Sequence, residues 1–139
     1  MEASLAQIDE FIQTHRRAIM ITYRQDGSLQ TSPVRVGRDG RGHIVVTSRS
    51  VTAKVHNLAR DPRVSLCVVT EKWSGGIWLH VDGRCEVIRQ PEAMPLLEQE
   101  YRLREGKDHP DWEQFRHDMA AENRAALLIT PTRAACSGK

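Results

Sequence analysis

The side chains best suited to do chemistry are hydroxyl and basic residues gathered between positions 47 and 54. Hydroxyls stand at Thr47, Ser48, Ser50 and Thr52, and positive charges stand at Arg49 and Lys54. Hydroxyls donate hydrogen bonds to anions, and charged donors make such bonds shorter and stronger. The cluster therefore has the composition of an anion-binding site.

The segments on either side of the cluster favour the same interpretation. The β-branched run Ile44–Val46 predicts a strand before it. Val51, Val55 and Leu58 recur after it at the helical spacing i, i+4 and i+7, and Asp61-Pro62 ends that pattern. The free N–H groups of a helix's first turn point toward a ligand, and the macrodipole adds about half a positive charge there.

A simpler interpretation of the same residues stays open. Hydroxyls that precede a helix are usually N-caps. Ser50 would then cap a surface helix, and Arg49, Lys54 and Arg60 would be solvated.

Motifs that carry their own nucleophile or metal are missing. The chain has no G-x-S-x-G, H-E-x-x-H, P-loop or G-x-G-x-x-G pattern, and its six histidines show no metal-ligand spacing. Tyr23 and His80 are weak candidates for a proton donor. This scarcity fits an enzyme whose cofactor carries the reaction while the protein positions it. Trp78, on the same strand face as His80, would be the apolar wall of such a site, or else a core or dimer contact.

Composition limits the class of protein. The 139 residues predict a single domain over positions 1–139, and 20 Lys and Arg against 18 Asp and Glu argue against nucleic-acid binding. The first residues lack the apolar core of a signal peptide, and no apolar run approaches the ~20 residues that span a bilayer. We therefore expect a cytoplasmic protein. Cys67 and Cys85 lie in predicted strands, where we expect buried thiols.

Turn signals divide the chain into short strands and peripheral helices. The expected strands are Ala18–Tyr23, Leu29–Gly37, Ile44–Val46, Val64–Val69, Ile77–Ile88 and Ala125–Thr130, the last one ended by Pro131. Further helices are expected over Pro91–Glu105 and over Asp111–Ala121. Ser4 and Gln7 predict a capping box that opens an N-terminal helix. The buried face of that helix would carry Leu5, Ile8, Phe11 and Ile12. Pro33 predicts an edge strand or a bulge, and Gly83 a bend. This pattern is typical of a closed or partly closed β-barrel.

The segment V-T-S-R-S-V-T-A-K-V-H-N-L-A-R-D-P-R-V-S-L, residues 46–66, resembles the signature of the pyridoxamine-5′-phosphate-oxidase-like flavin-binding family. Within that family it is most similar to the actinobacterial branch that binds the deazaflavin coenzyme F420, and the similarity extends over most of the chain. The resemblance implies a mainly β (α+β) fold, a split β-barrel of about six strands with short peripheral helices. It also implies a homodimer with two cofactor sites at the subunit interface.

The resemblance assigns cofactor-binding roles residue by residue. The phosphate would be held by Thr47, Ser48, Arg49, Thr52, Ala53, Lys54 and Asn57. The strand with Ser32, Pro33 and Val34 would line the ring, and Trp78 and Gln30 would come from the other subunit. Many relatives have an aromatic residue where Arg35 stands. Arg35 would therefore contact an acidic coenzyme tail or an anionic substrate, or else face solvent.

Three functional hypotheses follow. The first is an F420H2-dependent reductase that transfers a hydride to an unidentified small organic acceptor. The second keeps the fold and binds FMN, as an oxidase or flavin reductase; the third is a non-catalytic F420-binding or storage protein. Pyridoxamine-phosphate oxidases carry a further C-terminal segment, so we do not expect that activity here. The expected partners are a second copy of the chain and the acceptor, with no metal, nucleic acid or membrane.

Overall fold

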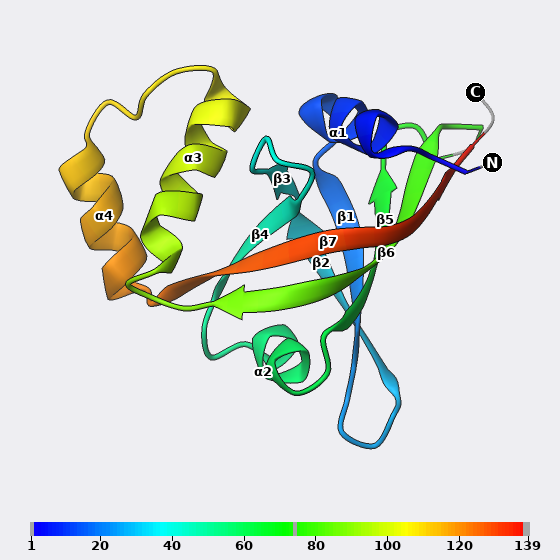
Figure 1. Ribbon diagram of the computed structural model, residues 1–139, viewed down its shortest axis with the longest axis horizontal. Coiled ribbons are helices and arrows are strands. Elements are labelled where there is room, and N and C mark those ends of the chain that lie inside the picture. Colours follow the sequence, from blue (N-terminus) through cyan, green and yellow to red (C-terminus); the bar gives the residue numbers. More distant parts are fainter. Residues whose placement is uncertain (1, 74, 138–139) are drawn as a thin grey trace.

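The computed structural model describes residues 2–73 and 75–137. It is built on one seven-stranded antiparallel sheet that curls into a half-barrel (Figure 1), in the spatial order β2-β1-β5-β6-β7-β4-β3. The strands are β1 (Arg17–Tyr23), β2 (Leu29–Arg35), β3 (Gly37–Arg38), β4 (Ile44–Arg49), β5 (Arg63–Val69), β6 (Trp78–Ile88) and β7 (Arg124–Cys136). The helices are α1 (Leu5–Thr14), α2 (Ala53–Arg60), α3 (Ala93–Glu105) and α4 (Trp112–Ala121). The mainly β fold with peripheral helices is confirmed, although the expected strand Leu29–Gly37 is interrupted at Val36.

Buried and more exposed residues alternate along the strands, so one face of the sheet lies in the core. Every second residue of β1 and β5 is buried, as in the first half of β6. Met20, Leu66 and Val81 are register partners on neighbouring strands and are at most 1% exposed. Burying a side chain of this size contributes about 1.5–3 kcal/mol. This inner face therefore holds the sheet in its curled form.

The curled sheet does not close. β2 is one edge and β3 with β4 is the other, and the described residues form no ladder between these edges. Pro33 lies in the middle of β2, so its missing N–H faces the open side, and the prediction of an edge strand is confirmed. We call the gap between β2 and β4 the seam.

Helix α1 begins as predicted and buries less than predicted. Ser4 and Gln7 form the capping box, and Ile8 and Ile12 are buried. Phe11 is half-buried against the core. The prediction for Leu5 is wrong: it is 57% exposed, at a small crevice that is also lined by His43 and Ile44.

The junction of β4 and α2 differs from the sequence interpretation. The Ser50 hydroxyl donates to the carbonyl oxygen of Asn123 at 2.7 Å, and Thr52 holds the N-cap position. Ser50 is therefore not the N-cap. Val51 is 75% exposed because it lies in the turn before α2, so its predicted place on the buried helix stripe is wrong.

The last strand continues beyond its predicted end. β7 passes through Pro131 to Cys136 because the register with β6 shifts at Asp82 and Gly83. A Cβ at Gly83 would lie 2.7 Å from the carbonyl oxygen of Thr130, so only glycine fits this close approach. The irregularity accommodates a proline inside the strand, and the predicted bend at Gly83 is confirmed.

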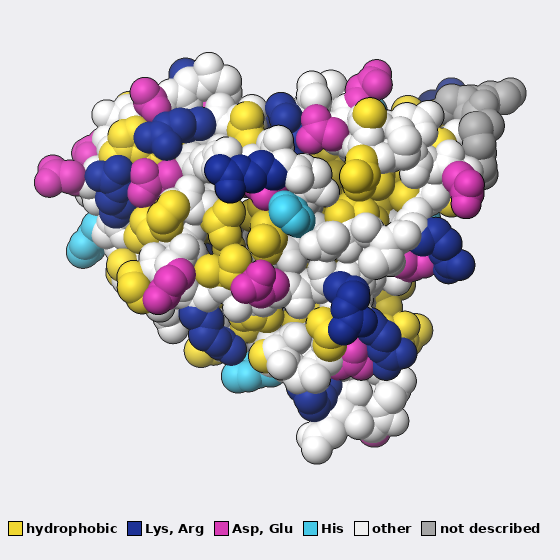
Figure 2. Space-filling view, in the orientation of Figure 1, with side chains coloured by type: hydrophobic (Ala, Val, Ile, Leu, Met, Phe, Trp, Pro, Cys, Tyr) yellow, Lys and Arg dark blue, Asp and Glu magenta, His cyan; other side chains and the backbone are white. Residues whose placement is uncertain are grey.

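Helices α3 and α4 form a hairpin beside the half-barrel, in yellow-green and orange in Figure 1. Leu97 of α3 is buried, and Tyr101 packs against Trp112 and Phe115 with ring centroids 5.7 and 5.8 Å apart. On the face in Figure 2, acidic and basic side chains lie interspersed. Among the described residues, no helix is long and apolar enough to cross a membrane.

Candidate functional site

The seam opens into a pocket of about 480 Å³, which we call the seam pocket. It is lined by Pro33, Val34 and Arg35 of β2, Thr47, Ser48 and Arg49 of β4, Thr52 and Lys54 at the start of α2, and Arg124 at the start of β7. All of these except Arg124 are residues that the sequence assigned to cofactor binding. The structure therefore brings the basic cluster and the proline-containing strand together, although more than ten positions separate them in the chain.

The hydroxyls of the seam pocket are held in a small network. The Ser48 and Thr52 hydroxyls lie 2.9 Å apart, and the Thr52 hydroxyl donates to the carbonyl oxygen of Arg49 at 3.1 Å. Thr52 makes no side-chain capping bond to α2. The N–H groups of the first turn therefore have no acceptor from their N-cap residue and can serve a ligand.

Positive charge dominates the seam pocket. Arg35, Arg49, Lys54 and Arg124 line it, and none of the described residues that line it is acidic. Glu122 lies nearby and accepts an ion pair from Arg124 at 2.8 Å and a longer one from Arg49 at 3.7 Å. The Glu122 carboxylate thus pairs with the guanidiniums of both Arg124 and Arg49.

The Lys54 ammonium is partly desolvated in the seam pocket and lies near a second positive charge. Its burial, and then the neighbouring Arg124 guanidinium, lower the pKa of the Lys54 ammonium below its ordinary value. Among the described residues, Lys54 forms no ion pair. A bound phosphate would supply the counter-charge that this ammonium lacks, so the donor set fits a phosphate group.

Family membership agrees with this arrangement. Residues 4–136 match the pyridoxamine 5′-phosphate oxidase family. The chain belongs to this family. Pyridoxamine-5′-phosphate-oxidase-like proteins include oxidoreductases and bind flavins, so a pocket for a phosphorylated cofactor is consistent with the membership.

Solved structures show how widely this fold is shared. Conserved hypothetical protein Rv2991 from Mycobacterium tuberculosis has a TM-score of 0.78 at 21% identity, covering 96% of this chain and 84% of that one. A protein named F420 Reductase has a TM-score of 0.64 at 20% identity, covering 94% and 96%. General Stress Protein 26 from Bacillus anthracis has a TM-score of 0.65 at 12% identity, covering 95% and 92%. At these identities the likeness concerns the fold.

Five predicted cofactor residues of this family member do not line the seam pocket: Gln30, Ser32, Ala53, Asn57 and Trp78. Ala53 is exposed at the first position of α2, and Ser32 is half-buried on β2. Asn57 is 7% exposed, and its amide donates to the Thr22 hydroxyl at 3.1 Å and to the Gln30 side-chain oxygen at 2.7 Å. Asn57 and Gln30 thus brace α2 against β1 and β2 in the single chain.

The remaining candidates lie on the side of the sheet that faces away from the core. Trp78 is 42% exposed, and the ring of His80 lies 2.8 Å from the Asp82 carboxylate. The Ser65 hydroxyl, and then Arg133 and His80, hold the pKa of Asp82 below its usual value. The Arg63 guanidinium carbon lies over the ring of Tyr23, 4.2 Å from the ring centroid. Neither weak proton-donor candidate borders the seam pocket.

The two cysteines differ in environment. Cys85 is 6% exposed, and burial raises the pKa of its thiol to about 12. Cys67 is only half-buried, so its predicted burial is wrong: its position in β5 points outward, opposite His80. Among the residues that the structure describes, no three His, Cys, Asp or Glu side chains are grouped to hold a metal.

Arg124 is the pocket residue that sequence reasoning missed. It is the register partner of Arg49, because β7 pairs with β4 across 75 positions of sequence. No local motif marks it, and only the pairing of the last strand with β4 brings it to the pocket.

Proposed function

We propose that this protein is an F420H2-dependent reductase that transfers a hydride from the deazaflavin to a small organic acceptor. The observation that carries the proposal is the seam pocket, in which Arg49, Lys54 and Arg124 meet the hydroxyls of Ser48 and Thr52 at a helix start. A fold neighbour over 94% of the chain is named F420 Reductase, which supports the choice of coenzyme.

The residues of this chain would act by binding and orientation. Lys54, Arg49 and Arg124 would hold the phosphate, and Pro33 and Val34 would border the adjoining part of the cofactor. The bound deazaflavin supplies the hydride, so the protein need not form a covalent intermediate.

A second copy of the chain would complete the site. Away from the core, β1, β2, β5 and β6 carry a surface that we call the outer face: Ile19, Ile21, Leu29, Thr31, Pro33, Ser65, Cys67, Trp78 and His80. Ile19, Ile21 and Cys67 belong to neither hydrophobic cluster of the core. Leu29 is 53% and Trp78 is 42% exposed. The outer face is continuous with the seam pocket at Pro33, which favours a homodimer whose partner copy, through its Trp78, forms the second wall.

FMN is the alternative cofactor, because it carries the same phosphate on a ribityl chain and flavins are bound within this family. A non-catalytic F420-binding protein is the other alternative. Binding titrations of the purified protein with oxidised F420 and, separately, with FMN distinguish these possibilities. Quenching of tryptophan fluorescence is the signal, and Trp78→Phe identifies the contribution of that residue against Trp73 and Trp112.

The outcomes are distinct. Micromolar binding of F420 with little binding of FMN supports the deazaflavin assignment and justifies an acceptor screen with F420H2. Tight FMN binding reassigns the protein as a flavoprotein. Binding of F420 with no oxidation of F420H2 by any quinone, enone or tetrapyrrole acceptor favours the storage protein. Binding of neither cofactor overturns the proposal.

A further inference from the structure

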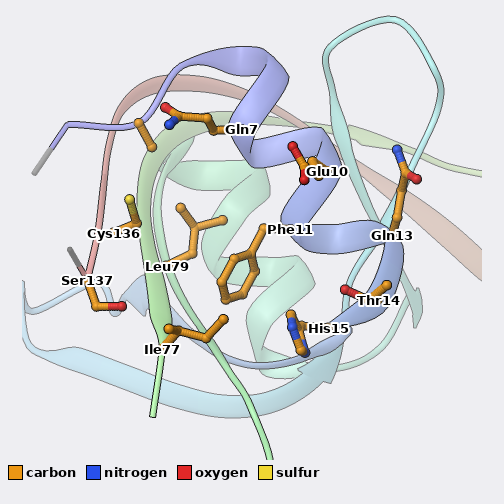
Figure 3. A pocket seen from close by; sticks show the side chains of 11 residues that line it. Gln7, Glu10, Phe11, Gln13, Thr14, His15, Ile77, Leu79, Cys136 and Ser137 are labelled. Atoms are coloured by element: carbon orange, nitrogen blue, oxygen red, sulfur yellow. The ribbon is translucent and has the colours of Figure 1, made fainter. Parts of the chain in front are cut away.

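A second cavity lies between α1 and the strands β6 and β7. It has a volume of about 510 Å³, and we call it the α1 cleft. Figure 3 shows Phe11, Ile77 and Leu79 pointing into it, with Gln7, Glu10 and Gln13 of α1 around it. Its floor is therefore apolar, and Glu10 is the one acidic side chain among the described residues that line it.

A basic groove extends from the α1 cleft toward the seam pocket. This groove, of about 360 Å³, shares Thr14 and His15 with the α1 cleft and Arg35 with the seam pocket. We call it the rim groove; its charged lining is Arg16, Arg17, Arg35 and Arg104 against Glu71 and Glu105. The apolar α1 cleft and the arginine-lined rim groove thus meet at Thr14 and His15.

Two of the four arginines already have partners. Arg104 pairs with Glu100 at 3.0 Å and with Glu105 at 2.6 Å. Arg16 donates to the carbonyl oxygens of Gln13 and of Arg104 at 3.2 and 3.1 Å. Within residues 2–73 and 75–137, Arg17 and Arg35 form no ion pair. Of the two carboxylates described in the rim groove, Glu105 already pairs with Arg104. Glu71 is therefore the one that would compete with a ligand for Arg17 and Arg35.

Arg17 and Arg35 also lie directly opposite each other. They are register partners at the end of the β1–β2 ladder, and both are exposed. Like charges directly opposite on antiparallel strands destabilise the pairing. A carboxylate bound between the two guanidiniums would reverse that repulsion.

We propose that the α1 cleft and the rim groove together form a binding site for an amphipathic carboxylate. Its carboxylate pairs with Arg17 and Arg35, and its alkyl or aryl body packs against Phe11, Ile77 and Leu79. Glu10 lines the α1 cleft and would repel a carboxylate from it, which favours the orientation with the carboxylate at the arginines. Arg35 is the one described residue that this site shares with the seam pocket.

The test compares octanoate with 1-octanol, which share a chain length and differ in charge. Each is titrated into the ¹⁵N-labelled protein, and amide shifts are followed by NMR. We expect octanoate to shift amides of α1 and residues 77–79 and to bind about tenfold more tightly than octanol. Arg17→Gln is expected to weaken octanoate binding about tenfold and to leave octanol binding unchanged. Arg41→Gln is the matched control, because Arg41 is exposed outside both cavities, and it should alter neither affinity.

Other results overturn the inference. Equal affinities for octanoate and octanol, or equal effects of Arg17→Gln and Arg41→Gln, would mean that the arginine pair binds no carboxylate. Shifts confined to residues 47–54 would place octanoate in the seam pocket. Lys54→Ala separates the two sites, since it should weaken cofactor binding and leave octanoate binding intact. Phe11→Ala and Ile77→Ala each remove part of the apolar wall, and each should weaken the binding of both octanoate and octanol. Ile77→Ala serves as the test should Phe11→Ala fail to fold.

Discussion

Arg49 and Arg124 are direct register partners on β4 and β7, and both line the seam pocket. Two like charges at this spacing repel each other. Glu122 relieves the repulsion only in part, because it lies 2.8 Å from Arg124 and 3.7 Å from Arg49. The folded chain therefore carries a positive potential that an anionic ligand would lower, and this potential is the basis of the first three predictions.

Glu122→Gln removes the carboxylate that pairs with both of these arginines. We expect the affinity for FMN or F420 to rise a few-fold at low salt and the gain to shrink at high salt, where exposed charges are screened. The unfolding free energy should fall by about 0.2–1 kcal/mol, as is typical of an exposed ion pair. Titrations at low and high NaCl check this, with Glu113→Gln on α4 as the control. Weaker cofactor binding in Glu122→Gln would contradict the electrostatic account.

Lys54→Ala should weaken cofactor binding by about 1.5–3 kcal/mol, roughly ten- to a hundred-fold, because it removes a charge-assisted contact to the phosphate. Isothermal titration with the cofactor that binds the wild type measures the change. Arg63→Ala is the control: Arg63 pairs with Asp61 at 2.7 Å and does not line the seam pocket. Unchanged affinity in Lys54→Ala would remove the anion-site assignment.

Cofactor affinity should depend on pH through Lys54. Its pKa is lowered in the free protein by burial and by Arg124, and a bound phosphate would raise it again. Below the lowered pKa the ammonium is charged in both states and affinity is full. As pH rises through that pKa, binding must take up a proton and affinity falls. Titrations from pH 7 to 10 in buffers of different ionisation enthalpy measure this uptake, which Lys54→Met should abolish.

The dimer proposal predicts that a charge on the outer face separates the subunits. Ile19→Asp should halve the molar mass seen by light scattering and reduce cofactor binding, while the circular dichroism spectrum stays folded because Ile19 lies outside the core clusters. Leu5→Asp is the matched control, since Leu5 is exposed on α1 away from that face. A wild-type protein that is monomeric with bound cofactor would refute the shared site.

The local parts of this structure follow from the sequence, and its long-range pairings do not. The Ser4 capping box, the edge position of Pro33 and the bend at Gly83 each depend on neighbours in the chain or on one residue's backbone chemistry. Arg124 reaches the seam pocket only through the pairing of β7 with β4, which no periodicity reveals. Leu5 and Val51 fit an apolar stripe, yet tertiary packing leaves both exposed.

Asn57 is where family resemblance and geometry make different predictions. Resemblance assigns it to the phosphate, whereas its amide bonds to Thr22 and Gln30 at a position only 7% exposed. Asn57→Ala would leave the buried Thr22 hydroxyl and the half-buried Gln30 side-chain oxygen without their donor. It should lower the unfolding free energy by about 1–3 kcal/mol, measured by urea denaturation, with cofactor affinity within twofold of wild type. The double variant Asn57→Ala with Thr22→Val should cost less than the sum of the single changes, because each single change already breaks the shared bond. Normal stability with lost affinity would instead make Asn57 a phosphate ligand, and the contacts seen here would then change when the cofactor binds.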